Sequence, residues 1–172
     1  MGMPEGFRYE KAWLLNNEKI ASEAIALWSE FNILPRNVNP ADRARELITV
    51  AYDGDRMVGV TTGEVTYYEP VRQKFVFMRI FIHPDYEKGG VSVPLTIAAR
   101  EDLRQWSIDN PNLKIAGYGA IITAPGYGEK PYLPAGLYPV GYTPDGHQIR
   151  LYWFEHFRLP LTMPAIPPGL HR

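Results

Sequence analysis

A pair of glycines stands where an apolar segment gives way to a helical pattern, and this arrangement could bind a diphosphate. The apolar segment is 75–82, the glycines are Gly89 and Gly90, and the helical pattern runs from Val91 to about Ile108. The start of a helix presents backbone N–H groups without intrahelical partners, backed by the positive end of the helix dipole. Glycine lets a ligand reach the backbone and permits positive φ. The alternative is a capped loop-to-helix joint that binds nothing.

Other familiar kinds of reactive site are missing from the sequence. There is no cysteine, which excludes disulfides, thiolate metal sites and a cysteine nucleophile. His147 and His156 are too far apart along an extended segment to form a local metal pair, and no acidic cluster accompanies them. No metal is therefore predicted. The sequence also lacks a Gly-x-Ser-x-Gly elbow, a Walker loop and a dinucleotide fingerprint.

Length and composition describe one globular unit. The 172 residues are 45% hydrophobic and 22% charged, so we expect one domain over 1–158 followed by a proline-rich tail over 159–172. The formal net charge of −1 gives no global basic field, so nucleic acid is not an expected partner. No apolar run reaches membrane-spanning length, and the first residues lack the layout of a signal peptide. A cytoplasmic protein without membrane contact is the expectation.

The elements that would position the glycine turn follow from periodicity. Asn16 or Asn17 can cap a first helix, whose apolar stripe recurs at helical spacing. The segment 75–82 is apolar apart from Arg79, as a central strand covered on both faces should be. Between 123 and 135 prolines and glycines break any regular pattern. The strands we expect are 7–15, 47–52, 57–68, 75–82, 113–122, 139–142 and 147–155.

The glycine turn resembles the acyl-CoA-binding signature of the GCN5-related N-acetyltransferase (GNAT) superfamily. In that signature a Pro-x-Tyr step leads into a Gln/Arg-x-x-Gly-x-Gly/Ala turn. Here Pro84-x-Tyr86 matches and the middle glycine falls on Gly90, whereas Glu87 and Ser92 depart from the pattern. The order of strands and helices over 7–155 is also similar to that superfamily. The resemblance implies an α/β (α+β) acyl-CoA N-acyltransferase-like fold, with a mixed, mostly antiparallel twisted sheet of six to seven strands flanked by helices.

The same resemblance implies acetyl-CoA as co-substrate and a place for it. The strands 75–82 and 113–122 would separate at their ends and admit the pantetheine arm, which would pair with main-chain groups of Ile80, Phe81 and Ile82. The residues implied for the pyrophosphate are Lys88, Gly89, Gly90, Val91 and Ser92.

Acyl transfer from a thioester to an amine needs a deprotonated amine and a protonated thiolate. The resemblance implies that Tyr138 is the acid, because Leu137-Tyr138-x-x-Gly141-Tyr142 is similar to the superfamily's Leu-Tyr-x-x-x-Gly-Phe segment, in which the tyrosine lies near the thioester sulfur. The superfamily often places the base on the central strand or its neighbour. Strand 75–82 has no acidic residue, so the resemblance makes Glu64 on the preceding strand the first candidate and Glu69 the second. The alternatives are solvated carboxylates and, for Tyr138, a packed aromatic side chain.

Aromatic residues make up 13% of the chain and many lie near 123–142. They could line a pocket for an amine-bearing acceptor or form a surface for a homo-oligomer. Three functions remain open from sequence. The first is an N-acyltransferase, an N-acetyltransferase by resemblance, acting on a small-molecule or peptide amine. The others are an inactive binding or interaction module of the same fold, and a structural or assembly protein that uses the aromatic face and the tail.

Overall fold

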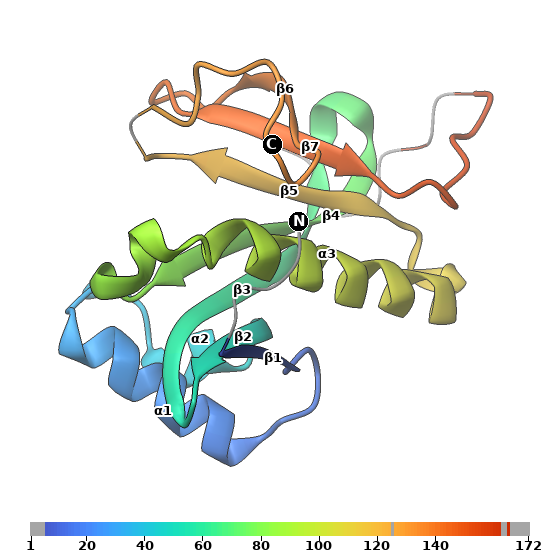
Figure 1. Ribbon diagram of the computed structural model, residues 1–172. Helices are drawn as coiled ribbons and strands as arrows, with labels where there is room; N and C mark the ends of the chain where they lie inside the picture. Colours follow the sequence, from blue (N-terminus) through green and yellow to red (C-terminus); the bar gives the residue numbers. More distant parts are fainter. Residues whose placement is uncertain (1–5, 125, 163–164, 166–172) are drawn as a thin grey trace.

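A seven-stranded mixed sheet organises the computed structural model, which describes residues 6–124, 126–162 and 165 (Figure 1). The strand order is β1-β2-β3-β4-β5-β7-β6, and only the β4–β5 pair is parallel. This confirms the predicted fold class. The strands are β1 (Phe7–Lys11), β2 (Leu47–Asp53), β3 (Arg56–Tyr68), β4 (Gln73–Ile82), β5 (Ile115–Ile122), β6 (Tyr138–Tyr142) and β7 (Gln148–Trp153).

In the described part of the chain, three α-helices cover the sheet: α1 (Glu18–Glu30) and α2 (Pro40–Ala44) on one face, and α3 (Ser92–Asp109) on the other. The Asn17 side chain caps α1, as predicted, by accepting a hydrogen bond from the Ile20 N–H at 3.2 Å. Short 3-10 helices lie at Glu69–Val71, Pro84–Gly89 and Pro111–Leu113. Within the described residues, no helix has the length and the apolar content to cross a membrane.

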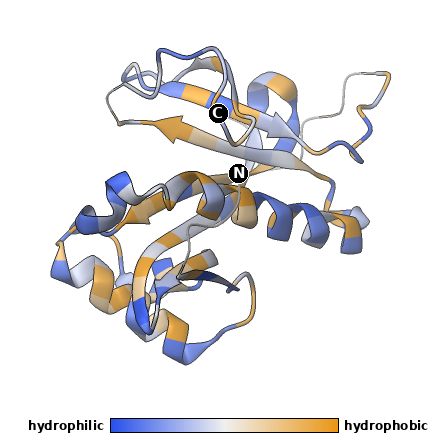
Figure 2. Cartoon of the chain, in the orientation of Figure 1, coloured by the Kyte–Doolittle hydropathy of each residue, from blue (hydrophilic) through white to orange (hydrophobic). Residues whose placement is uncertain are grey.

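The sheet separates two apolar layers because successive strand residues point to opposite faces. Along β2, Val50 packs with the buried stripe of α1, whereas Ala51 packs with Leu95 of α3. The alternation of apolar and polar residues along α1 is visible in Figure 2. The predicted stripe of α1 is confirmed: Ile20, Ala24, Leu27 and Trp28 are buried.

The first strand is shorter than predicted. It ends at Lys11, because the N–H groups of Ala12 and Trp13 both donate to the carbonyl of Ile48 and the chain then turns. Leu14 and Asn16 adopt positive φ in that turn, which a strand cannot contain. Other ends shift as well: β5 begins at Ile115, after the 3-10 helix at Pro111–Leu113, and β7 covers only Gln148–Trp153.

Two further expectations concern β4 and the segment after β5. The β4 strand is not covered along its whole length, because Arg79 and Ile80 are exposed. The described residues of 123–137 contain no helix or strand, as the prolines and glycines predicted. Residues 1–5, Pro125 and most of the predicted tail, 163–164 and 166–172, lie outside the described residues.

Candidate active site

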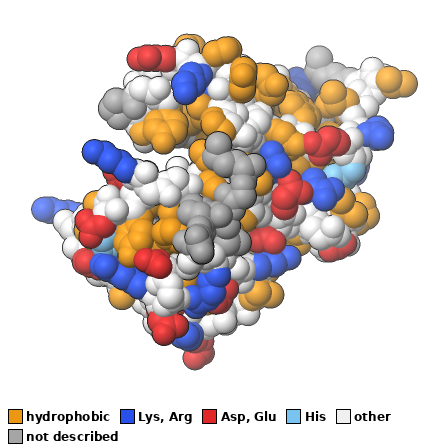
Figure 3. Space-filling model, viewed as in Figure 1, with side chains coloured by type: hydrophobic (Ala, Val, Ile, Leu, Met, Phe, Trp, Pro, Cys, Tyr) orange, Lys and Arg blue, Asp and Glu red, His pale blue; other side chains and the backbone are white. Residues whose placement is uncertain are grey.

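The central strands β4 and β5 separate at the end where the glycine turn begins. Their parallel pairing runs from Lys74 opposite Ile115 to Phe77 opposite Gly119 and then stops. Beyond that point the last three residues of β5 pair only with β7, whereas β4 continues beside β3 to Ile82. Figure 3 shows the surface hollowed between the two halves of the sheet at this end. We call the space between 78–82 and 120–122 the gap.

Main-chain groups of β4 line the gap. The His83 N–H donates to the Val58 carbonyl at 2.8 Å, in register with the Phe81–Val60 pair. Hydrogen-bonded pairs alternate along antiparallel strands, so the main-chain groups of Phe81 face β3 and those of Ile80 and Ile82 face the gap. The side chain of Ile80 is 43% exposed and that of Ile121, on the facing strand, is 46% exposed. The gap therefore combines free peptide groups with apolar walls.

The glycine turn is a 3-10 helix, not an open loop. The His83 side chain caps it by accepting a hydrogen bond from the Asp85 N–H at 3.2 Å. Gly90 then takes a left-handed conformation, with φ of 74°, and an added Cβ there would meet no atom within 4 Å. Lys88 and Gly89 are exposed beside it, and so is Glu87.

The turn leads into a helix start with unused donors. The first α3 hydrogen bond runs from the Leu95 N–H to the Val91 carbonyl at 3.0 Å, and no side chain of the described residues caps Val91. The N–H groups of Ser92 and Val93 therefore have no intrahelical acceptor. The space beside Gly90 is therefore open on the side of an added Cβ, next to these donors.

A pocket of about 240 Å³ opens beside the gap on the face of α1 and α2. Its walls are mostly apolar, and its polar residues are Arg43, Arg79 and Thr62. It reaches the gap through Ile80 and Phe81. The remaining lining residues are Trp28, Ile33, Leu34, Pro35 and Val60.

Four charged side chains form an ion-pair chain along this pocket. Oε2 of Glu46 accepts from Nη1 of Arg43 at 2.7 Å and from Nη1 of Arg79 at 3.3 Å, and Oε1 of Glu64 accepts from Nη2 of Arg79 at 2.7 Å. Glu64, the first candidate for a base, is thus brought near the gap but is held by Arg79. Glu69 starts the 3-10 helix between β3 and β4, at the opposite end of β4 from the gap.

A buried arginine fixes the irregular segment 126–137, which we call the roof loop. Arg150 on β7 is fully buried and donates to the carbonyls of Gly128 at 3.1 Å, Lys130 at 2.5 Å and Leu137 at 3.3 Å. It also donates to Oε1 of Gln148 at 2.6 Å. No carboxylate of the described residues pairs with it, and burial lowers the pKa of its guanidinium.

A second anchor holds the other end of the roof loop. The Ala135 carbonyl accepts from the Tyr118 hydroxyl at 2.7 Å and from Nη1 of Arg100 at 3.3 Å. Burial raises the pKa of Tyr118, so this hydroxyl stays protonated and serves as a donor. The roof loop therefore has a defined conformation, although it contains no helix.

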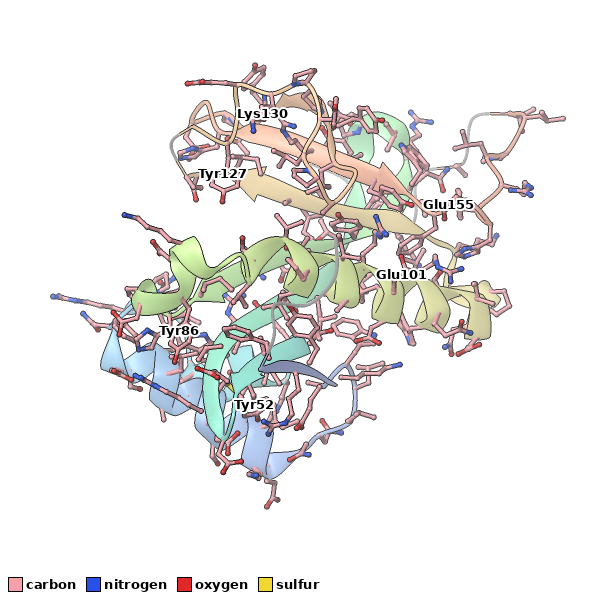
Figure 4. All side chains as sticks on the ribbon, viewed as in Figure 1. Tyr52, Tyr86, Glu101, Tyr127, Lys130 and Glu155 are labelled. Atoms are coloured by element: carbon pink, nitrogen blue, oxygen red, sulfur yellow. The ribbon has the colours of Figure 1, made fainter. Side chains whose placement is uncertain are left out.

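Tyr138 does not lie next to the gap. It is 60% exposed on β6, at the level of Gly119, with β7 between β6 and β5. Two strand spacings place its backbone about 10 Å from that of β5. Tyr127 on the roof loop is 50% exposed and lies near the end of β5, because its neighbour Gly128 approaches Gln148, which pairs with Ile122 (Figure 4).

The three histidines within the described residues take structural positions. His83 is 3% exposed and packs edge-on against the ring of Phe31. His156 hydrogen-bonds with the Ser107 hydroxyl, and His147 lies 3.5 Å from a carboxylate oxygen of Asp145. Over the described part of the chain, no group of three His, Asp or Glu side chains is arranged to hold a metal ion.

The fold is similar to that of solved acetyltransferases. YncA of Salmonella typhimurium, solved with its cofactor acetyl-CoA, is 10% identical with a TM-score of 0.64, and the match covers 91% of this chain and 98% of that one. A GNAT-family acetyltransferase from Streptococcus pneumoniae is 13% identical with a TM-score of 0.54, covering 84% and 96%. Naa50 of Arabidopsis thaliana, bound to a bisubstrate analogue of CoA and a peptide, is 14% identical with a TM-score of 0.57, covering 87% and 99%.

At these identities the likeness shows the fold. No protein-family model and no curated protein matches the sequence.

Sequence reasoning missed two groups of residues in this region. Arg150 interrupts the apolar pair Ile149 and Leu151 in a strand, a pattern that could have indicated a buried cation. The ion-pair chain from Arg43 to Glu64 gives no such signal, because its members come from α2, β3, β4 and the segment before β2.

Proposed function

We propose that this chain is a divergent member of the GNAT superfamily and transfers an acetyl group from acetyl-CoA to a primary amine. The observation that carries the proposal is the separation of β4 from β5. The gap that it leaves lies between the helix start at Gly90 and the pocket on the opposite face of the sheet. The diphosphate would bind the N–H groups around Gly90, and the pantetheine arm would pair with the main-chain groups of Ile80 and Ile82. YncA and Naa50 were solved with acetyl-CoA or a CoA analogue, which supports acetyl-CoA as the co-substrate.

In the proposed reaction the amine nitrogen attacks the thioester carbonyl carbon, so a C–N bond forms and the C–S bond breaks. The amine loses one proton, and the departing thiolate gains one. Glu64 lies on the pocket side of the gap and is the proposed base, directly or through water. The resemblance assigns the acid to Tyr138, but the acid proposed here is Tyr127, because it lies nearer the end of β5.

One observation supports an inactive binding module as a second candidate. The Glu64 carboxylate is paired with Arg79 at 2.7 Å, so a structural ion pair accounts for this side chain without a role as a base. Thiol release from acetyl-CoA across a panel of amines separates the two functions. The cytoplasmic location, the domain limit at residue 158 and the homo-oligomer stay predictions.

The binding site is tested by Gly90→Asp, measured by isothermal titration with acetyl-CoA. Gly90 has open space around it, so the variant should fold, but its carboxylate would repel the diphosphate and abolish binding. Gly146→Asp is the matched control, because Gly146 also has positive φ and open space but lies in the β6–β7 turn. Undiminished affinity in a folded Gly90→Asp protein would refute the placement.

A further inference from the structure

We infer that the acyl acceptor is a small amino acid, or a close analogue, with an apolar side chain and a carboxylate beside its amine. The inference rests on the proposed acyltransferase function and concerns the pocket beside the gap. Among the described residues that line this pocket, the charged groups are two guanidinium groups and no carboxylate. Guanidinium groups select carboxylates, often through paired hydrogen bonds. A simple amine has no carboxylate that could accept hydrogen bonds from these arginines.

The two arginines keep donors for a ligand. Their contacts with Glu46 and Glu64 use Nη1 of Arg43, and Nη1 and Nη2 of Arg79. A guanidinium has more N–H donors than these contacts use. Nε and Nη2 of Arg43 and Nε of Arg79 can therefore bind a carboxylate while all three ion pairs persist. The Arg43 side chain is only 15% exposed, and partial burial strengthens such a charge-assisted bond.

The apolar walls of the pocket indicate what side chain the acceptor carries. Trp28, Leu34, Val60 and Phe81 give the pocket an apolar surface. Its volume of about 240 Å³ is below the range of roughly 300–1,000 Å³ that is usual for drug-sized ligands. A small molecule with one apolar group fits these walls better than a polar or extended one.

The position of the pocket places the amine at the thioester. Ile80 and Phe81 line the pocket and belong to the part of β4 that borders the gap. With the carboxylate on Arg43 and Arg79 and the side chain against the apolar walls, the amine is the group left to face the gap.

Matched acceptors test this inference on the full-length protein. Thiol release from acetyl-CoA is measured with L-leucine against isoamylamine, and with L-phenylalanine against 2-phenylethylamine. We expect kcat/KM to favour each acid by about 10- to 100-fold, the worth of a hydrogen bond to a charged group. Arg43→Met and Arg79→Met should bring the acid-to-amine ratio of kcat/KM toward one for both pairs of acceptors. Each variant leaves Glu46 paired with the other arginine.

Arg45→Met is the control, because Arg45 is an exposed neighbour that pairs with Asp42 and does not line this pocket. It should keep the wild-type ratios. Equal use of acid and amine, or a preference for the amine, overturns the inference.

A binding measurement separates this inference from the proposed reaction. Saturation-transfer NMR with L-phenylalanine and 2-phenylethylamine needs no acetyl-CoA. If L-phenylalanine binds the wild type and Arg43→Met weakens that binding, the result supports the acceptor class even if the wild type releases no thiol. Failure of L-phenylalanine to bind, or equal binding of both probes, refutes it.

Discussion

Replacing Arg150 by methionine tests how the roof loop is held. The guanidinium is fully buried and reaches three loop carbonyls, those of Gly128, Lys130 and Leu137, besides the side chain of Gln148. Methionine fills a similar elongated space without any donor. The carbonyls of Gly128 and Lys130 would then be left without this partner, whereas Leu137 keeps the N–H of Leu133 at 3.1 Å.

The expected loss of stability is the difference between two opposing effects. Each hydrogen bond to a charged group is worth about 1.5–3 kcal/mol, and Arg150 makes four of them. The opposing effect is desolvation: burying a guanidinium without a carboxylate partner costs on the order of several kcal/mol, and methionine avoids this cost. We expect Arg150→Met to lower the free energy of unfolding by about 3 kcal/mol net. For a domain of this size that corresponds to a fall in Tm of about 6–12 °C.

Scanning calorimetry measures the fall in Tm, and hydrogen exchange locates it. Amides of 126–137 should exchange faster in Arg150→Met, whereas those of β2 and β3 should not change before global unfolding. Arg158→Met, a change at an exposed arginine, should stay within about 2 °C of the wild type. An Arg150→Met protein with unchanged Tm and unchanged loop exchange would refute the reasoning.

Three further predictions concern the site and the pH dependence of stability. Glu87→Gln and Glu87→Arg should tighten acetyl-CoA binding, more at low salt than at high, because they remove an anion beside Gly90; titrations in which neither variant gains affinity would place the diphosphate elsewhere. Tyr127→Phe should lower turnover about 10²- to 10⁴-fold without weakening acetyl-CoA binding. Tyr138→Phe should keep turnover within about threefold of the wild type, since β7 separates Tyr138 from β5. The reverse pattern would assign the acid to Tyr138. Burial raises the pKa of the Asp102 carboxyl above its usual value, so the contribution of this carboxyl to stability falls as pH rises through the raised pKa. Asp102→Asn removes this titration, and its Tm relative to the wild type should be higher at pH 7 than at pH 4.5; a difference independent of pH would contradict the assignment.

Local signals in the sequence predicted much of the fold. The strand before Pro84, the left-handed glycine at Gly90 and the helix after Val91 follow from apolar runs, turn residues and helical spacing. The hairpin between β2 and β3 follows from Asp53-Gly54-Asp55 between two β-rich segments. These features depend on residues close together in the chain, so periodicity and turn chemistry reveal them.

The features that the sequence did not reveal depend on the register between segments far apart in the chain. The separation of β4 from β5 beyond Phe77 was implied by the family resemblance, and no residue pattern in either strand marks it. Glu64 could be chosen as a carboxylate near the gap, but its pairing with Arg79 requires the β3–β4 register. The clamp from Arg150 to the roof loop requires β6, β7 and the loop to be in place together.

The last residues of β4 connect all three parts of the candidate site. Because side chains alternate along a strand, Arg79 and Phe81 face the pocket, whereas Ile82 packs toward α3 and the glycine turn. The peptide groups of Ile80 and Ile82 face the gap between these two surfaces. In the proposed reaction, an acetyl-CoA molecule that enters from the α3 face and an amine substrate that enters from the α1 face would therefore meet beside Ile80. Under the proposed function, the pantetheine arm would be the partner of the peptide groups that β5 leaves unpaired.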